Sequence, residues 1–236
     1  MPPPIRTISN FRDVGGWPTR EGRRVRTGRL FRSGHLGGAS DEDLARLAGL
    51  GIRTVIDFRG AQDEDADGPS RLPAGARRVN IPMSDPAGAS DIRELLYRSD
   101  AAGLVTERCA EFGALLRGLA ALHPLPALMH CSAGKDRTGW AASLVLLVLG
   151  VDEELVIEHY LLSNEQRREE NDRLLANHRP GMDPEWIRPF LEVRPDYARA
   201  ALAAADERFG SFDAYVEVGL GVDAEMLARL RAELLE

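Results

Sequence analysis

One stretch of the sequence, residues 130–139, constrains the fold more than any other. It reads HCSAGKDRTG and lies between a short apolar run, 127–129, and a long one, 140–149. A buried strand that enters a glycine-containing loop and continues into a helix gathers backbone N–H groups around one point, which suits an anion. The sequence therefore predicts a strand over 125–130, a helix over 138–149 and an anion-binding loop between them.

The loop carries a thiol and three charged side chains. Cys131 lies at the expected helix N-terminus among cations, which favours its thiolate at neutral pH. Arg137 can clasp two phosphate oxygens through its planar guanidinium. Lys135, the only lysine in the chain, adds a second cation, and Asp136 stands between the two. A nucleophile and a cationic clamp around one anion pocket predict phosphoryl transfer through cysteine, which also needs a proton donor and later a base.

The remaining loop residues are expected to complete the same pocket. Gly134 permits a close approach or an unusual backbone angle. The Thr138 hydroxyl can donate to the sulfur of Cys131 and ease its departure from a phosphocysteine. His130 is placed to hold the loop through hydrogen bonds and is not assigned as a base. The phosphate is expected to be bound by one run of residues: Ser132, Ala133, Gly134, Lys135, Asp136 and Arg137.

A nucleotide-binding loop is excluded by two positions. Gly134 and Lys135 match the end of that motif, which also requires a glycine at position 129 and a serine or threonine at position 136. Met129 and Asp136 occupy those positions. The loop is therefore not expected to cradle a nucleotide.

Apolar patterns along the chain predict one α/β domain. A β-branched run over 52–58 predicts a buried strand that contains Asp57, whereas residues 60–75, rich in acidic residues, Gly and Pro, predict a loop. Strands mix with helices up to the loop, and only helices follow it, which favours a central, largely parallel sheet flanked by helices with a helical C-terminal extension. Strands are also expected over 25–32 and 77–82, and helices over 41–50, 91–98, 101–122, 152–177, 183–190, 195–205, 212–219 and 224–235.

Charge and composition narrow the partners and the compartment. The net charge is -7 and no Lys/Arg-rich run stands out, so nucleic acid is not an expected partner. No apolar run reaches the roughly 20 residues that span a bilayer, and the N-terminus lacks a signal peptide pattern. The protein is expected to be cytoplasmic with reduced thiols, although secretion without a cleaved signal stays open. The oligomeric state is not predicted.

The loop resembles the His-Cys-x5-Arg-Thr/Ser-Gly signature of the cysteine-dependent protein tyrosine phosphatases. Its Gly-Lys-Asp-Arg core is similar to the same part of the loop in the bacterial branch of that family, which has lipid- and dual-specificity members. Four further stretches resemble that branch and extend the likeness over about residues 8–165: NFRDVGG at 10–16, RLFRSG at 29–34, LGIRTVIDFR at 50–59 and YLLSN at 160–164.

The resemblance implies a tyrosine-phosphatase-like fold and a phosphocysteine intermediate on Cys131, with transition-state binding by Arg137. It implies no metal and no other cofactor. The substrate would be a phosphorylated protein or a phospholipid, with phosphotyrosine first and phosphoserine or phosphothreonine next. Lys135 resembles the loop lysine of phosphoinositide phosphatases, which adds inositol lipids to the expected substrates. Residues 1–236 would form a single domain with its catalytic core over about 8–165 and a helical extension or lid over about 166–236.

Three aspartates compete for the role of general acid. The Trp-Pro-Asp loop of classical members reads Trp-Pro-Thr at 17–19 here and lacks the carboxyl group. Asp57 and Asp136 are favoured because the bacterial branch carries both in matching stretches, and Asp85, in a loop after a strand, ranks third. Asp57 could equally anchor the fold by pairing with a nearby arginine such as Arg59.

Three other functions remain compatible with parts of the pattern. A catalytically weak phosphate-binding module would keep the loop and lose the acid. A cysteine-loop sulfurtransferase would form a persulfide. Arsenate reduction uses a related loop but needs further reactive cysteines, and only Cys109, in a helical pattern, is left.

Overall fold

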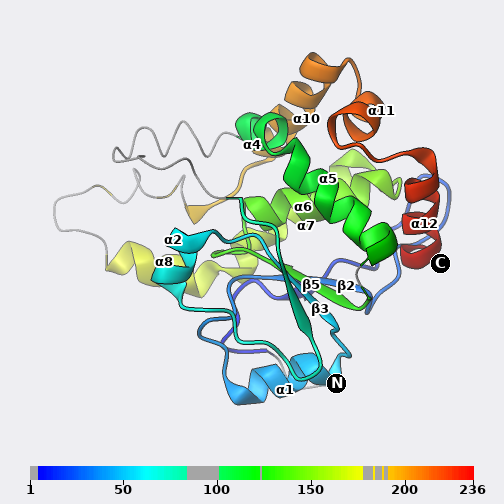
Figure 1. The fold of residues 1–236 in the computed structure, drawn as a ribbon. Coiled ribbons are helices and arrows are strands. Elements are labelled where there is room, and N and C mark those ends of the chain that lie inside the picture. The colour runs from blue at the N-terminus through cyan, green and yellow to red at the C-terminus, as the bar shows by residue number, and fades with distance from the viewer. Residues whose placement is uncertain (1–4, 84–100, 123, 178–182, 184–187, 189–190) are drawn as a thin grey trace.

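A sheet of parallel strands with one antiparallel edge runs through the protein (Figure 1). The computed structural model describes residues 5–83, 101–122, 124–177, 183, 188 and 191–236. Within these residues the sheet has five strands in the order β1-β2-β5-β3-β4. β2, β5, β3 and β4 are mutually parallel, and β1 pairs antiparallel with β2. The strands are β1 (Arg12–Asp13), β2 (Leu30–Ser33), β3 (Thr54–Asp57), β4 (Arg77–Asn80) and β5 (Ala127–His130).

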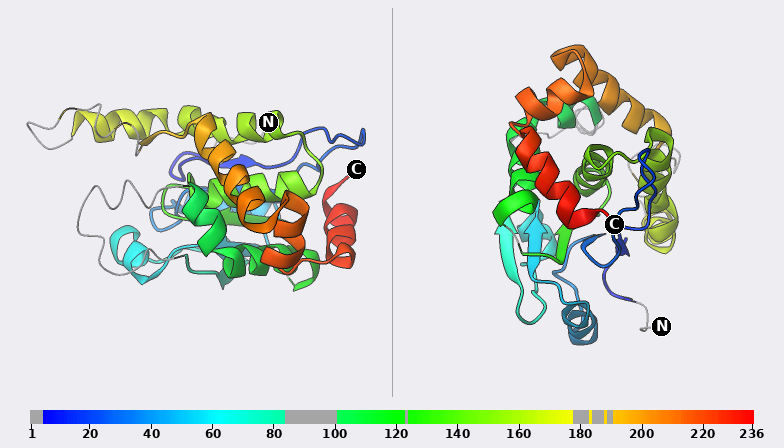
Figure 2. Two further views of the ribbon diagram at one scale, coloured as in Figure 1. Left: turned by 90° about the horizontal axis from the view of Figure 1, so that it is seen from above. Right: turned by 90° about the vertical axis from the view of Figure 1, so that its right-hand side faces the viewer.

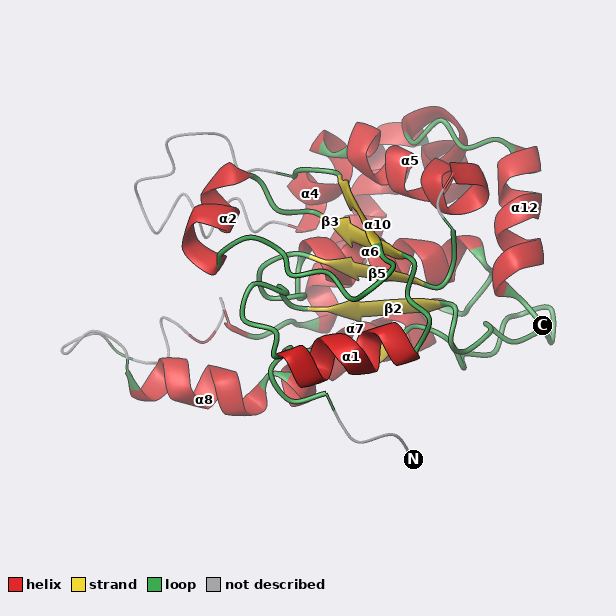
Figure 3. Cartoon of the chain, turned by 60° about the horizontal axis from the view of Figure 1, so that its bottom comes forward, coloured by secondary structure: helices red, strands yellow, loops and turns green. Residues whose placement is uncertain are grey.

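Helices cover both faces of this sheet, so the predicted α/β class is confirmed. Helix α1 lies on one face, and α5, α6, α10 and α12 lie on the other (Figures 2 and 3). α2 and α8 lie beyond the end of the sheet at which the parallel strands finish (Figure 3). The helices are α1 (Asp41–Gly49), α2 (Ala61–Asp67), α4 (Ala101–Glu107), α5 (Cys109–Arg117), η1 (Gly118–Leu122), α6 (Arg137–Val148), α7 (Glu153–Gln166), α8 (Arg168–Ala176), α10 (Pro195–Phe209), α11 (Phe212–Ala214), η2 (Tyr215–Gly219) and α12 (Ala224–Leu234).

The three central strands are buried on both faces. Successive side chains alternate between two apolar clusters, as the pleat of a strand requires. The larger cluster, toward α6, receives Leu30, Ile56 and Met129. The smaller one, toward α1, receives Phe31, Val55 and Leu128. This double burial explains why β3 and β5 read as continuous apolar runs rather than as alternating ones.

The helical C-terminal region packs into the larger cluster. Ala201, Tyr215 and Leu230 are each at most 1% exposed and belong to the same cluster as Met129. The chain end also returns to the N-terminal region, because residue 25 forms an antiparallel bridge with Leu235. Residues 195–236 therefore share the core of the sheet domain.

The prediction of a loop over residues 60–75 was wrong in its first half. α2 forms there, with Gly60 at its N-cap and with Asp63 and Glu64 in its first turn, where acidic side chains suit the helix dipole. None of its residues is buried. A short helix without an apolar face leaves no periodic signal in the sequence.

Other boundaries differ from expectation in smaller ways. The helix expected over 152–177 is interrupted at Arg167, and the one expected over 101–122 is interrupted at Arg108. The strand expected over 25–32 shortens to Leu30–Ser33. The helix expected over 91–98 and most of the one over 183–190 lie outside the described residues. No helix within the described ranges is long and apolar enough to cross a lipid bilayer.

Candidate active site

The loop after β5 lies in the middle of the edge at which the parallel strands end. β5 has β2 on one side and β3 on the other, and ligands of open α/β sheets bind outside the carboxyl ends of the strands. Cys131 follows β5 directly and is 2% exposed. Arg137 is the first residue of α6. The structure therefore holds the predicted nucleophile and the predicted clamp at the two ends of one loop.

The carbonyl groups of three successive loop residues point toward donors from other parts of the chain. By contrast, the backbone N–H groups of Ser132, Ala133, Gly134 and Asp136 meet no acceptor among the described residues. Amides of this kind form an anion-binding concavity when their carbonyls are turned away. The bonds to the carbonyls are His35 N to Ser132 O (2.9 Å), Arg167 Nη1 to Ala133 O (2.9 Å), Arg32 Nη2 to Gly134 O (2.7 Å) and Asn10 Nδ2 to Gly134 O (2.7 Å).

Gly134 has both properties that the sequence suggested for it, an unusual backbone angle and a close approach to another segment. Its φ is +65°, in the left-handed region that favours glycine. A Cβ at this position would lie 2.3 Å from the carbonyl oxygen of Ser33. The loop can therefore approach the end of β2 this closely only with glycine here.

Asp63, on α2, binds Arg137 through both carboxylate oxygens. Arg137 Nη1 donates to Asp63 Oδ2 at 2.7 Å and Nη2 donates to Oδ1 at 2.9 Å. Oδ1 also accepts the Ser132 hydroxyl at 3.0 Å, and Oδ2 accepts the backbone N–H of Gly60 at 2.9 Å. A bidentate pair of this kind fixes the orientation of the guanidinium and ties α2 to the loop.

Asp63 is ionised at neutral pH and therefore unsuited to donate a proton. Burial alone would raise its pKa, but the hydrogen bonds and charge of Arg137, with smaller help from Gly60 and Ser132, lower it from 3.8 to about 2. Since the folded-state pKa lies below the unfolded one, this carboxylate stabilises the fold fully above about pH 4. The contribution is lost as the pH falls through 2.

Replacing Asp63 with asparagine is expected to lower kcat by about tenfold. The amide keeps the size of the side chain but loses the charge and one acceptor, so Arg137 is less firmly oriented for a transition state. Steady-state kinetics on an aryl phosphate, with inorganic phosphate as a competing inhibitor, measure the effect. An unchanged kcat with tighter phosphate binding would show instead that Asp63 competes with the substrate for Arg137.

His130 is fully buried and braces the start of the loop. Burial lowers its pKa to about 4 in spite of the nearby Asp57, so the ring is neutral at pH 7. Its Nδ1 lies 3.2 Å from the carbonyl oxygen of Cys131, and its Nε2 lies 3.2 Å from Ser70 Oγ. With the proton on Nδ1, the ring donates to the carbonyl of Cys131 in the loop. This geometry suits the loop-holding role predicted for His130.

Asp57 is buried at the end of β3 in a set of cationic partners. Its carboxylate accepts Arg59 Nε at 3.1 Å, Arg78 Nη2 at 2.9 Å and the Ser70 hydroxyl at 2.8 Å. Burial raises the pKa of Asp57, but His130 and then Arg59 outweigh it, and the net pKa is lowered. Its side chain is 0% exposed. These contacts favour the fold-anchoring interpretation of Asp57 over a proton-donating one.

Asp136 and Lys135 differ sharply in exposure. The Asp136 side chain is 48% exposed, while that of Lys135 is 7% exposed, with Nζ 3.7 Å from Asp136 Oδ2. Thr138 is fully buried, and its hydroxyl has no hydrogen-bond partner among the described residues, so the bond expected to Cys131 is not formed here. Asp85 lies outside the described residues.

Sequence reasoning missed four residues that touch the loop. Asp63 was missed because α2 has no apolar period; the usable signal was an acidic run that starts three residues after Gly60. Asn10 and Arg32 lie in stretches that resemble the phosphatase branch, but the resemblance gave them no role. Arg167 lies in a polar run without a motif.

A buried cysteine and an arginine, placed at the two ends of an anion loop between a parallel strand and a helix, define the class of cysteine-based phosphatases. The comparison with protein families agrees: residues 3–236 match the model of the tyrosine phosphatase family. The chain belongs to the tyrosine phosphatase family, and it is a hydrolase of the protein-tyrosine-phosphatase type.

Relatives match nearly the whole chain. A candidate tyrosine-protein phosphatase of Cupriavidus necator is 37% identical over 244 residues, which covers 97% of this chain and 86% of the relative. The triple specificity protein phosphatase PtpB of Mycobacterium tuberculosis is 30% identical over 270 residues, which covers 96% of each. Among solved structures, the core catalytic domain of the PP-IP phosphatase SIW14 from S. cerevisiae matches 78% of this chain and 87% of its own at 17% identity and a TM-score of 0.39. That likeness is too loose to carry an argument, and the family assignment rests on the sequence matches.

Proposed function

We propose that this chain hydrolyses phosphate monoesters through a phosphocysteine on Cys131, with phosphotyrosine as the main substrate. One observation carries the proposal: the loop carbonyls are bound from outside, which leaves a ring of backbone N–H groups beside a buried thiol and Arg137. Such a ring suits the three equatorial oxygens of a phosphoryl group in transfer.

The reaction proceeds in two displacements. The Cys131 sulfur attacks phosphorus, the P–O bond to the leaving group breaks, and the leaving oxygen takes a proton from a carboxylic acid. Water then attacks the phosphorus, the S–P bond breaks, and the carboxylate accepts the proton of the water. Arg137 and the loop amides hold the equatorial oxygens throughout. The hydroxyl of Thr138, which has no hydrogen-bond partner among the described residues, is available to the sulfur when it leaves as a thiolate.

Asp136 is the proposed general acid. It is half-exposed at the start of α6, one residue from the clamp, with only the amine of Lys135 as an ion-pair partner among the described residues. The pKa of Asp57 is instead lowered by His130 and then Arg59, and that of Asp63 by Arg137, which makes each a poor proton donor at neutral pH. The proposed role of Lys135 is to add positive charge to the phosphate site.

Replacing Asp136 with asparagine is expected to lower kcat/KM on a phosphoserine peptide by about 10²-fold. The loss is smaller on an aryl phosphate, because a phenol leaves more readily than an alcohol and needs less help from an acid. Measuring kcat/KM on both substrates tests the assignment.

Asp57→Asn is the matched control. Breaking this buried network is expected to destabilise the fold by about 3–5 kcal/mol, and any loss of kcat/KM is expected to be similar on the two substrates. A loss that was larger on the phosphoserine peptide in Asp57→Asn, and not in Asp136→Asn, would exchange the two roles.

The substrate range is proposed to extend beyond phosphotyrosine. PtpB, which aligns with almost the whole chain, is named for triple specificity. A buried lysine beside the anion loop adds charge that suits a polyanionic headgroup. We therefore include phosphoserine or phosphothreonine peptides and phosphoinositides as secondary substrates.

Residues 1–236 are proposed to act as one catalytic unit, with residues 8–165 as its core. The shared apolar cluster of Met129, Ala201 and Leu230 supports this, because removal of the C-terminal helices would expose it. α8 is the proposed lid, since it lies at the end of the sheet where the loop lies (Figure 3).

The proposal is tested by trapping the intermediate. Rapid acid quenching during turnover of phosphotyrosine peptide, phosphoserine peptide and phosphoinositide, followed by peptide mapping, should find phosphate on Cys131. Turnover without added metal that peroxide abolishes and thiol restores supports the same chemistry, because an accessible thiolate oxidises readily. Turnover with no phosphoenzyme and no sensitivity to peroxide would contradict the proposal.

A further inference from the structure

Behind the loop, on the side of its carbonyl groups, lies a cluster of polar side chains to which the proposed reaction gives no role. We call it the rear network: Asn10, Arg12, Arg32, Ser163 and Arg167. Its first four members come from the stretches at 10–16, 29–34 and 160–164 that resemble the phosphatase branch. Asn10, Arg32, Ser163 and Arg167 are buried, at 2%, 0%, 1% and 5% exposure.

Two guanidinium groups of this network converge on one hydroxyl. Arg12 Nη2 donates to Ser163 Oγ at 3.0 Å, and Arg32 Nη2 lies 3.3 Å from the same oxygen. Arg12 also binds the side-chain oxygen of Asn10, whose amide nitrogen in turn donates to Gly134 O. The network therefore reaches the loop directly through Arg32 and indirectly from Arg12 through Asn10.

Arg12 and Arg32 form no ion pair with a carboxylate within the part of the chain that the structure describes. Among the described residues no carboxylate oxygen lies within 4 Å of Arg12 or Arg32, whereas Arg167 pairs with Glu170 at 3.0 Å. Burial, followed by the charge of Arg32, lowers the pKa of Arg12 to about 8. Burial lowers the pKa of Arg32 to about 10, against the opposing influence of Cys131, then Tyr160 and then Asp136. Both remain protonated at neutral pH.

An unpaired buried charge is unfavourable for folding, and replacement by an apolar side chain is often neutral or stabilising. Two such charges side by side therefore indicate a use outside the stability of the fold. Arg32 interacts electrostatically with Cys131, which the proposed function uses as a nucleophile and then as a phosphoryl carrier, and more weakly with Asp136. The negative charge that balances the rear network is therefore expected to arise in the loop, on the thiolate and on the bound phosphoryl group.

We propose that Arg32, within the rear network, is a positioning residue that holds the phosphate loop in its anion-binding shape and supplies fixed positive charge to the thiolate and the phosphoryl group. The inference rests on the proposed function. Gly134 O and the N–H of Lys135 belong to one peptide unit, so a cation bound at the carbonyl polarises that unit and makes its N–H a stronger donor. Arg32 thus acts through the backbone and need not touch the substrate.

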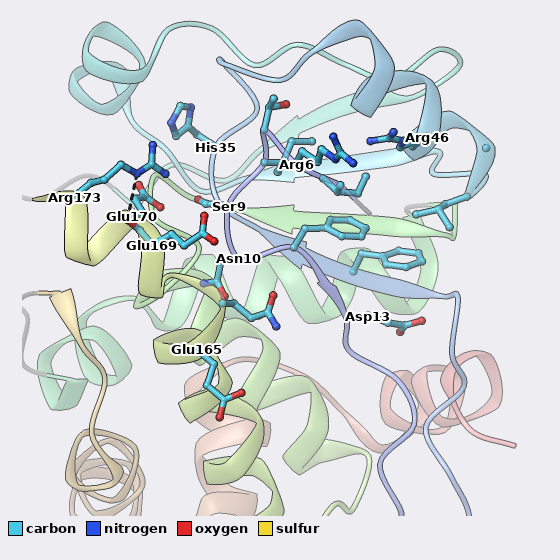
Figure 4. A pocket seen from close by; sticks show the side chains of 18 residues that line it. Arg6, Ser9, Asn10, Asp13, His35, Arg46, Glu165, Glu169, Glu170 and Arg173 are labelled. Atoms are coloured by element: carbon cyan, nitrogen blue, oxygen red, sulfur yellow. Dashed lines mark hydrogen bonds between the residues drawn. The ribbon is translucent and has the colours of Figure 1, made fainter. Parts of the chain in front are cut away.

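Most of the network is buried, since Arg32, Ser163 and Arg167 are at most 5% exposed. A cavity of about 1020 Å³ lies between the N-terminal segment and the helices α7 and α8, and Asn10 is the only member of the network among the residues that line it (Figure 4). Charges screened from solvent act more strongly on their neighbours than exposed ones do.

The variant Arg32→Met distinguishes the proposed positioning role of Arg32 from a purely structural one. Gly134 O keeps its bond from Asn10 and Ser163 keeps its bond from Arg12, so no acceptor is orphaned. The midpoint of thermal unfolding is expected to stay the same or rise, while kcat/KM falls about 10- to 100-fold. Arg32→Lys keeps the charge and should recover most of the loss.

Arg117→Met is the matched control. Arg117 also donates its guanidinium to backbone carbonyls, those of Leu220 and Gly221, but in the C-terminal region. It is expected to show the opposite signature: a lower unfolding midpoint and an unchanged kcat/KM. Both variants remove an arginine that binds a backbone carbonyl, and they differ only in where that arginine lies in the fold.

Alkylation of Cys131 provides a readout independent of turnover. Wild type is expected to react faster with anionic iodoacetate, relative to neutral iodoacetamide, than Arg32→Met does, and Arg32→Lys should restore that preference. A lower unfolding midpoint for Arg32→Met, an unchanged kcat/KM, or an unchanged alkylation preference would each overturn the proposal. If wild type itself lacked phosphatase activity, the proposed function would fail instead, and the alkylation preference would still decide the role of Arg32.

Discussion

Cys131→Ser is expected to abolish turnover, with kcat/KM falling by at least about 10⁴-fold. A serine hydroxyl is a weak nucleophile at neutral pH, and His130 does not activate it, since its two ring nitrogens are turned toward Ser70 and the loop carbonyl. The fold should persist, because the exchange replaces sulfur by oxygen in a small buried side chain. Phosphate release and calorimetric binding of a phosphotyrosine peptide measure the two properties separately.

The control for this variant is Cys109→Ser. Burial raises the pKa of the Cys109 thiol, which favours the neutral form, and its sulfur contacts the carbonyls of Val105 and Thr106 within α4. Activity is therefore expected to survive that exchange. Turnover that persists in Cys131→Ser, or that disappears only in Cys109→Ser, would rule out Cys131 as the nucleophile.

Arg137→Lys is expected to lower kcat by about 10³-fold with a smaller change in KM. Lysine keeps the charge but presents a point cation instead of a planar fork, so it cannot bind two equatorial oxygens at once. It also loses the bidentate pair with Asp63, so the remaining cation is less firmly oriented. Because these contacts matter most in the transition state, the loss belongs in kcat.

An exposed arginine provides the comparison for this variant. Arg199 pairs with Glu154 on the surface, where its side chain is 49% exposed, and Arg199→Lys is expected to leave both kinetic constants unchanged. Single-turnover measurements on an aryl phosphate separate chemistry from product release. A kcat of Arg137→Lys close to that of wild type would remove Arg137 from the proposed mechanism.

The parts of the fold that the sequence predicted well are those with a local signal. β5, the loop and α6 follow one another without a gap, so apolar runs and loop residues sufficed to place Cys131 and Arg137 together. β3 was equally clear, because burial on both faces makes its sequence continuously apolar. In these segments a short window contains all the physical information that decides the structure.

The parts that were missed depend on contacts between distant segments. α2 has no buried residue, and what gives Asp63 its importance is Arg137, far along the chain. Whether Asp57 donates a proton or anchors the fold depends on Arg78 and Ser70, which no local pattern connects to β3. Ion pairs and hydrogen bonds of this kind leave no periodic pattern in the sequence. They can therefore be recognised only once the fold has brought the distant segments together.

The way the loop is held also bears on when the enzyme becomes active during its own synthesis. The bonds from Asn10 and Arg32 to Gly134 span 124 and 102 positions, and Arg12 reaches Ser163 across 151. Contacts so distant in sequence close late, because the entropy of the intervening chain must be lost first. A nascent chain that has emerged only as far as the loop contains Cys131 and Arg137 but lacks Ser163 and Arg167. Full activity should therefore begin only after the chain has emerged beyond α7 and residues 163–167 have met residues 10–32 behind the loop.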